Sequence, residues 1–214
     1  MNHREVYKRL SEGVDIRYKD ESKSMQLLAK VMFFNRRFMD MTTTLGKTIY
    51  FPSRAWVEEQ PYRAWRVLAH EMVHIEDGQK LGWRFPVMYA MPQGLAVFAL
   101  LGLVLQSWWP LLFLLFLAPL PAPWRRAFEM RGYAMSMAVS FWVGRDIPQE
   151  ERDRIALNFT GPEYYFMWPF KDAVRKEIGH WVKKILCGEI FEQGKVYGHV
   201  HQTFKLVKSR SSAN

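Results

Sequence analysis

The sequence predicts an α+β protein that is mostly helical, with a small sheet close to its N-terminal end. Apolar and polar residues alternate over 14–18, which predicts a strand. The β-branched run 42–51 has Leu45-Gly46-Lys47 at its centre and predicts a hairpin or two short strands. Most of the remaining chain carries apolar residues at helical spacing, divided by prolines and glycines that mark where helices begin and end.

Three of the expected helices are delimited at both ends, because proline is favoured at the first position of a helix and glycine after its last residue. They are opened by Pro61, Pro123 and Pro148 and closed by Gly78, Gly144 and Gly161. The full set of expected helical ranges is 4–10, 24–39, 61–78, 123–144, 148–161 and 170–186.

The end of the chain carries weaker signals. His199-Val200-His201 alternates like a strand and could bind a second metal, although an incidental pair of histidines is the simpler interpretation. The basic, serine-rich tail after Phe204 is expected to fray. A length of 214 residues suits a single domain, 1–214, with a hydrophobic hairpin inserted at about 86–123.

The amino-acid composition indicates which cellular compartment and which kinds of partner the protein suits. Cys187 is the single cysteine, which excludes an intrachain disulfide and a cysteine-based zinc site and suits a reducing compartment. The first residues are of mixed charge without an apolar core, unlike a secretory signal. The 30 Lys and Arg against 21 Asp and Glu favour anionic partners. These basic residues are scattered, so we expect a solvated basic surface rather than a nucleic-acid site; steeply salt-dependent DNA binding would argue otherwise.

The pattern His-Glu-x-x-His occurs as His70-Glu71-Met72-Val73-His74, inside one of the delimited helices. Residues four apart on a helix share one face, so both imidazoles can reach one zinc ion at about 2.0–2.1 Å. Glu71 points toward the same cleft but off the metal, where it can take a proton from water and deliver it to a leaving amine. The motif therefore predicts Zn²⁺ as cofactor, His70 and His74 as ligands and Glu71 as the catalytic base. The alternative is a helix with unrelated histidines.

A catalytic zinc site needs a third protein ligand and an open fourth position. One branch of motif-bearing enzymes places a histidine six residues after the second motif histidine; Lys80 stands there, which excludes that branch. The other branch takes a glutamate from a later helix, and Glu129 is the leading candidate because its neighbours on one face are apolar or small. An ion pair with Arg125 or Arg126 is the alternative for Glu129. Further candidate ligands are Glu163, Glu177 and Glu189.

With these residues the chain resembles the gluzincin metallopeptidases over about 40–134. It is most similar to the membrane-embedded CAAX prenyl endopeptidases and the heat-shock protease X family, which also have hydrophobic segments between the motif helix and the glutamate helix. The resemblance implies a zincin-like core of a small sheet, an active-site helix and a glutamate helix. In that core His70, His74 and Glu129 would be the zinc ligands and Glu71 the base.

The same resemblance implies that strand 48–51 is the sheet edge that pairs with an extended substrate. The families just named carry an aspartate four residues after the ligand glutamate, whereas this chain has Tyr133 there. A tyrosine hydroxyl could support the ligand in place of that aspartate.

The stretch 85–124 contains no charged residue and no histidine. If Glu129 and the histidines share one zinc, both ends of this stretch lie on the same side of any membrane. A single crossing would separate the ligands by about 30 Å of hydrocarbon. We therefore expect a helical hairpin at about 86–123, with Trp108 and Trp109 at its tip.

Basic residues flank the stretch on both sides, which favours both of its ends, and with them the active site, on the cytoplasmic side of a membrane. The expected location is therefore membrane-associated and not secreted. The alternative is a long apolar helical pair that is buried in an oligomer.

The sequence predicts a zinc metalloendopeptidase that hydrolyses peptide bonds of a protein or peptide substrate, associated with a membrane through 86–123. The alternative is a non-catalytic zinc-binding membrane or assembly protein that retains the motif. Tyr164, Tyr165 and His180 are candidate donors to the transition state, although such aromatic residues are more often part of a core. Asp77 could orient an imidazole or be an exposed acid.

Overall fold

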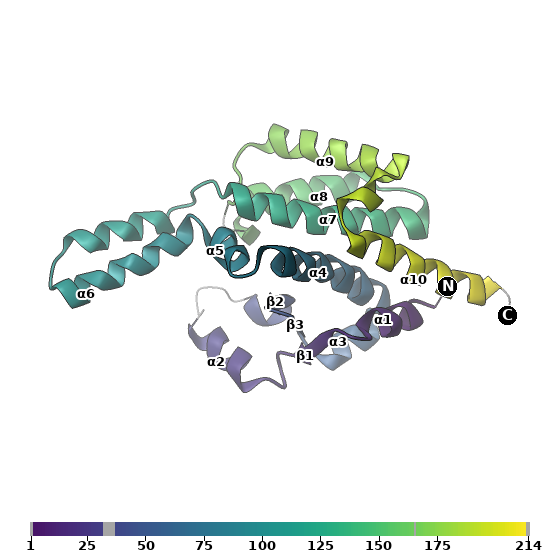
Figure 1. The fold of residues 1–214 in the computed structure, drawn as a ribbon, viewed down its shortest axis with the longest axis horizontal. Coiled ribbons are helices and arrows are strands. Elements are labelled where there is room, and N and C mark those ends of the chain that lie inside the picture. Colours follow the sequence, from purple (N-terminus) through teal and green to yellow (C-terminus); the bar gives the residue numbers. More distant parts are fainter. Residues whose placement is uncertain (1, 32–36, 165, 213–214) are drawn as a thin grey trace. The chain divides into compact units, whose positions relative to one another are not determined.

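The computed structural model describes residues 2–31, 37–164 and 166–212, and Figure 1 labels their elements. Contacts divide the chain into two compact units, one formed by Met1–Glu76 with Glu189–Asn214 and the other by Asp77–Gly188. Most residues are helical and the strands form one small mixed sheet, which confirms the α+β class at a coarse level. The single domain remains a prediction.

The first unit combines the sheet with helices. Helix α4 begins in this unit and continues into the second. The elements of the first unit are α1 (His3–Ser11), β1 (Asp15–Tyr18), α2 (Lys23–Val31), the 3-10 helix η1 (Phe38–Asp40), β2 (Thr43–Leu45), β3 (Thr48–Phe51), α3 (Arg54–Glu59), α4 (Pro61–Leu81), the 3-10 helix η5 (Glu189–Gln193) and α10 (Lys195–Ser212).

The sheet has the strand order β1-β3-β2, in which β1 runs parallel and β2 antiparallel to β3. The predicted hairpin is confirmed: Leu45 pairs with Thr48, and Gly46 turns the chain with a φ of +63°, which glycine adopts without strain. The central strand is β3, because it pairs on both sides. The expectation that 48–51 is a free edge is therefore wrong. Among the described residues, β1 and β2 are the outer strands of the sheet.

Helix α4 is held in the first unit by its apolar face. Pro61 begins the helix. Proline suits the first position because an N–H there would have no acceptor within the helix, and proline has no N–H. Trp65 and Leu68 are fully buried. The Trp65 indole N–H donates to Nδ1 of His3 on α1 at 3.2 Å, and its ring stacks on Phe204 of α10. Segments from both ends of the chain thus pack around the helix that carries the histidine motif.

The start of α10 is fixed to α4 by one carboxylate. Oε1 of Glu76 accepts a hydrogen bond from the backbone N–H of Lys195 at 2.9 Å, which satisfies one of the unpaired donors at that helix end. Gly194 lies directly against the same carboxylate, and a Cβ there would collide with Oε2 of Glu76. The cap therefore depends on a residue without a side chain.

The second unit is helical. In Figure 1, α7, α8 and α9 lie together, and α9 packs against both other helices. Its elements after the end of α4 are α5 (Arg84–Ala90), the 3-10 helix η2 (Gln93–Leu100), α6 (Leu101–Leu105), the 3-10 helix η3 (Trp109–Leu117), α7 (Pro123–Gly144), α8 (Gln149–Thr160), the 3-10 helix η4 (Pro162–Tyr164) and α9 (Lys171–Cys187).

The apolar stretch folds back on itself as predicted. Within the second unit the pair formed by η2 with α6 runs out and η3 returns beside it, and Figure 1 shows this hairpin extending from α7, α8 and α9. At its base the side-chain amide of Gln93 donates to the carbonyl of Leu120 at 3.1 Å. At its tip Gln106 has a left-handed backbone, and the N–H of Ser107 donates to the carbonyl of Gly102 at 3.2 Å. Both ends of the hairpin therefore lie at one place.

Few apolar side chains of the hairpin are covered within the chain. Leu103 is 80% exposed and Val104 77%, and both tip tryptophans are exposed. Among the described residues, no helix by itself combines the length and hydropathy of a bilayer span. The pair Arg84–Ala90 and Gln93–Leu105 does so only when taken together, across a bend of 94°.

Three expected boundaries were wrong. Helix α4 passes Gly78 and ends at Leu81, because an interior glycine costs a helix only about 1 kcal/mol, whereas Gly82 with a φ of +58° ends it. The tail does not fray at Phe204, since α10 continues to Ser212. The expected helix 24–39 stops as α2 at Val31, and 38–40 form η1; residues 32–36 of that expected helix lie outside the described residues.

We predict that Gly194→Ala lowers the free energy of unfolding by about 1 kcal/mol, because the new Cβ displaces the Glu76 carboxylate from the N-terminus of α10. Gly198→Ala in the same helix is the control. Its Cβ meets open space, and replacing an interior helical glycine should stabilise by up to about 1 kcal/mol. Denaturant unfolding followed by circular dichroism measures both; equal effects would contradict the role given to the cap.

Candidate metal centre

His70 and His74 lie one turn apart on the buried side of α4. Their imidazoles are 8% and 7% exposed, and their Nε2 atoms face each other at 3.2 Å. Two nitrogens bound to one tetrahedral zinc at about 2.0–2.1 Å would stand about 3.3–3.4 Å apart. The two nitrogens are therefore already at the spacing that a shared tetrahedral ion requires.

Glu71, between the two histidines, turns toward the sheet. Its Oε2 accepts a hydrogen bond of 2.7 Å from the hydroxyl of Thr44 in β2. A buried lysine stands close to it: Lys19, just after β1, is fully enclosed and its Nζ donates to the carbonyl of Phe38 at 2.5 Å. Burial lowers the pKa of Lys19 to about 8, while the negative charges of Glu71 and Asp40 oppose that shift. The Glu71 carboxylate thus accepts a hydrogen bond from the sheet, and the charge of a buried lysine interacts with it.

Glu129 lies on α7 and is 2% exposed. The hydroxyl of Tyr89 on α5 donates a hydrogen bond to its Oε1. The adjacent Phe128 packs against Phe85 of α5, with ring centroids 4.9 Å apart. Helix α5 thus touches α7 both at the carboxylate and beside it, and this contact orients the Glu129 side chain.

Both arginine neighbours of Glu129 contact other side chains. Arg126 pairs with Glu177 at 3.4 Å and lies over the ring of Trp168. Arg125 lies over the rings of Tyr89 and Tyr164. Glu177, another candidate ligand from the sequence, is thus the ion-pair partner of Arg126. Burial raises the pKa of Glu177, and the Arg126 charge only partly opposes this shift.

Asp77 is buried, not an exposed acid of the last turn. It stands three residues after His74 on the continuous helix α4 and pairs with Arg131 of α7 at 3.2 Å. Arg131 lies two residues beyond Glu129. This ion pair connects the segment of α7 that carries Glu129 to the end of α4.

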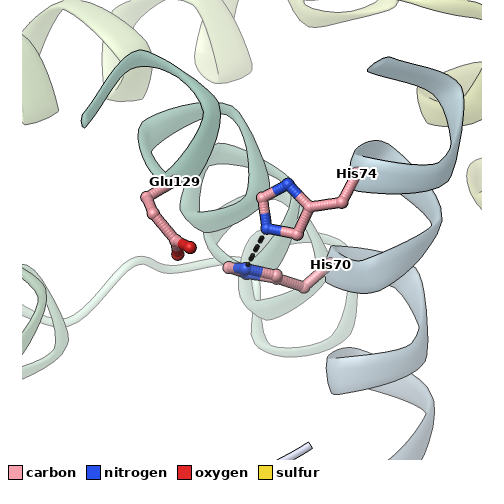
Figure 2. Close-up of side chains that lie close together, drawn as sticks. All are labelled: His70, His74 and Glu129. Atoms are coloured by element: carbon pink, nitrogen blue, oxygen red, sulfur yellow. Dashed lines mark hydrogen bonds between the residues drawn. The ribbon is translucent and has the colours of Figure 1, made fainter. Parts of the chain in front are cut away.

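The structure brings the three sequence-predicted ligands together. The ligand atoms of His70, His74 and Glu129 all lie within 4.8 Å of one another, and all three residues are buried. Figure 2 shows the Glu129 carboxylate turned toward the two imidazoles. Two imidazole nitrogens and one carboxylate oxygen form a donor set that suits zinc, although such a set also binds other divalent ions. The arrangement is compatible with a metal site, and it leaves the metal itself unassigned.

A second group of polar side chains in the second unit joins the two sequence candidates Tyr133 and Tyr164 to Asn158, which sequence reasoning missed. Asn158 of α8 donates to the hydroxyl of Tyr133 at 2.8 Å, and Tyr133 donates to the hydroxyl of Tyr164 at 3.0 Å. Desolvation raises the pKa of Tyr164 well above its ordinary value, and the charge of Glu129 adds to the effect. No sequence pattern marks Asn158, because its partner is 25 residues away and becomes a neighbour only when α8 packs beside α7.

The other sequence candidates have weaker positions. Glu189 and His180 are exposed, and His180 stands beside Glu177 on α9. His199 and His201 lie in α10, where residues two apart point to different sides, so the predicted strand is wrong and the pair does not share a face. Tyr165 and the side chain of Glu163 lie outside the described residues.

Comparison of the chain with protein-family models, with curated proteins and with solved structures found no match in any of the three.

We predict that the purified protein binds about one zinc per chain and that Glu129→Gln weakens zinc binding by more than the 10–100-fold typical of losing a supporting residue, because the carboxamide is a poor ligand. Glu177→Gln, which changes a half-buried acid of the same unit, should leave the affinity unchanged. Elemental analysis and a chelator competition titration measure both variants. An unchanged affinity of Glu129→Gln would remove this residue from the site.

Proposed function

We propose that this protein is a zinc-dependent metallopeptidase that hydrolyses peptide bonds with activated water. The observation that carries the proposal is the convergence of His70, His74 and Glu129, with Glu71 next to His70 on the same helix. A purely structural metal site does not need a carboxylate such as Glu71, which is next to a ligand in sequence, is held by the hydroxyl of Thr44 and does not itself bind the metal. Peptide hydrolysis does need one.

The chain's own groups divide the reaction between them. His70, His74 and Glu129 hold the metal, which when bound polarises the scissile carbonyl and makes water acidic enough to attack near neutral pH. Glu71 removes a proton from the attacking water through a carboxylate oxygen and later delivers it to the nitrogen of the leaving amine. The reaction requires the carboxylate form of Glu71 at the start, and the hydroxyl of Thr44 donates a hydrogen bond to one of its oxygens.

The substrate would lie along β2. This strand pairs with β3 on one side, and among the described residues no strand pairs with its other side. An extended peptide that adds to this edge gains backbone hydrogen bonds and passes directly over Glu71, because Thr44 of the same strand contacts that carboxylate. The edge proposed for the substrate is therefore β2, in place of the 48–51 strand.

Tyr164 is the best placed donor for the developing oxyanion. Its hydroxyl oxygen accepts the proton of Tyr133, so its own proton is available to a further acceptor. The electrostatic effect of Glu129 on Tyr164 indicates that the two side chains are close. Such a donor would strengthen its hydrogen bond as charge develops on the substrate oxygen.

We also propose that the hairpin docks the protein on a membrane, with the site on the cytoplasmic side. Its exposed leucines, valines and tryptophans form an apolar surface that water does not favour. The outgoing arm, 8 residues of η2 and 5 of α6, rises about 24 Å, less than the ~30 Å of a hydrocarbon core. The hairpin would therefore enter the bilayer and return, with the basic flanks Arg84 and Arg125 at its surface. Burial in an oligomer is the alternative.

We predict that Glu71→Gln lowers peptide hydrolysis about 10²–10⁴-fold while zinc content stays at the wild-type value, because the amide cannot act as a base. Glu76→Gln, on the same helix, keeps an oxygen acceptor for the α10 cap and should remain active. The measurements are cleavage of fluorescence-quenched peptide libraries and elemental analysis. A zinc-loaded wild type that cleaves nothing, or a Glu71→Gln variant as active as wild type, would favour the non-catalytic alternative.

For the hairpin we predict that wild-type protein floats with phosphatidylcholine vesicles, more strongly when phosphatidylserine is included, and that Leu103→Asp with Val104→Asp abolishes flotation. Leu27→Asp is the matched control, since Leu27 is an exposed leucine of α2 outside the hairpin. If the double variant instead breaks a soluble oligomer, detected by light scattering without vesicles, the hairpin is a protein interface.

A further inference from the structure

Among the hydrogen bonds of the described residues, Thr44 is the residue of β2 whose side chain bonds to α4, the helix with the histidine motif. In β2 it lies opposite Ile49, and its hydroxyl donates to Oε2 of Glu71 at 2.7 Å. Successive residues of a strand face opposite sides, so Thr43 and Leu45 point to the other face. Only the middle position of this short strand can make the contact.

This hydrogen bond restricts how Glu71 can act. A glutamate side chain has three rotatable bonds, and ordering it costs about 1.5–2 kcal/mol in side-chain entropy. Because the Thr44 hydroxyl already holds Oε2, the side chain of Glu71 is ordered before the substrate binds, and no further entropy is lost during the reaction. The other oxygen, Oε1, remains to receive the proton.

The surrounding charges support the same geometry. Lys19, packed over the ring of Phe38 at 3.9 Å, is held in place by a buried hydrogen bond and cannot swing out to solvent. Its charge interacts with that of Glu71, whereas Thr44 of β2 contacts the Glu71 carboxylate directly.

We propose that Thr44 is the positioning residue of Glu71, so that the strand that pairs with the substrate also orients the base. The proposal rests on the peptidase function proposed above. Its consequence is that substrate pairing and base orientation are coupled, because the backbone of Thr44 would bind the peptide while its side chain holds the carboxylate. A peptide that failed to pair with β2 would be cleaved slowly even when its scissile bond reached the metal.

The test compares Thr44→Val, which removes the hydroxyl at nearly constant volume, with Thr44→Ser, which keeps it. Thr44→Val should lower kcat about 10–100-fold with KM within about two-fold of wild type, and Thr44→Ser should restore most of the activity. The control is Thr48→Val, which removes a hydroxyl that also donates to a carboxylate of this sheet, Oδ2 of Asp15 at 2.6 Å, and should behave like wild type. All four proteins should bind zinc equally.

A second readout does not need turnover. Acetohydroxamate binds a zinc ion and donates from its acidic hydroxyl to a neighbouring base, so calorimetry on the zinc-loaded protein reports the position of Glu71. Thr44→Val and Glu71→Gln should both weaken its binding about ten-fold, and Thr48→Val should not. If Thr44→Val kept the wild-type kcat and hydroxamate affinity, the inference about Thr44 would be overturned while the proposed function would stand. Equal losses of kcat in Thr44→Val and Thr44→Ser would have the same meaning. A wild type that holds no zinc would overturn the inference together with the proposed function.

Discussion

Two imidazoles one turn apart on a buried helix face are the constraint on which the rest of this structure depends. Their facing nitrogens stand 3.2 Å apart, and that face of α4 also receives the carboxylate of Glu129. Removing such polar groups from water is costly unless each finds partners. The chain supplies them locally: Tyr89 donates to Glu129, and Arg131 neutralises Asp77 at the end of the same helix. One oxygen of Glu129 and one of Asp77 are partnered in this way, and the cluster of His70, His74 and Glu129 is compatible with a metal site.

Each unit supports its own part of the candidate site. The first unit packs the apolar side of α4 against α1 and α10 and presents the sheet to Glu71 through Thr44. The second unit places Glu129 by packing α5 against α7. Because a rigid sheet and packed helices hold side chains more accurately than loops do, the candidate base and the candidate third ligand are both preorganised.

The hairpin follows from the position of the candidate ligands. Its entry and exit meet at the contact of Gln93 with Leu120, so the chain leaves α5 and returns to α7 at the same place. Glu129 lies in the first turns of α7, the helix that follows the hairpin. An insertion of any length is therefore compatible with the position of Glu129 if the two ends of the insertion lie together. An apolar hairpin satisfies this requirement and leaves apolar side chains such as Leu103 and Val104 exposed.

The sequence by itself determined the existence of the helices opened by proline, the β2–β3 hairpin, the apolar hairpin and the identity of the candidate ligands, because these depend on local periodicity, turn residues and ligand spacing. It did not determine that β3 is the central strand, that α10 continues to Ser212, or that Asn158 reaches Tyr133. Strand order, helix length at a chain end and contacts between distant residues are decided by what packs beside each element. That information is a property of the folded chain, and Thr44 illustrates it: a common strand residue gains a defined partner only when the sheet meets α4.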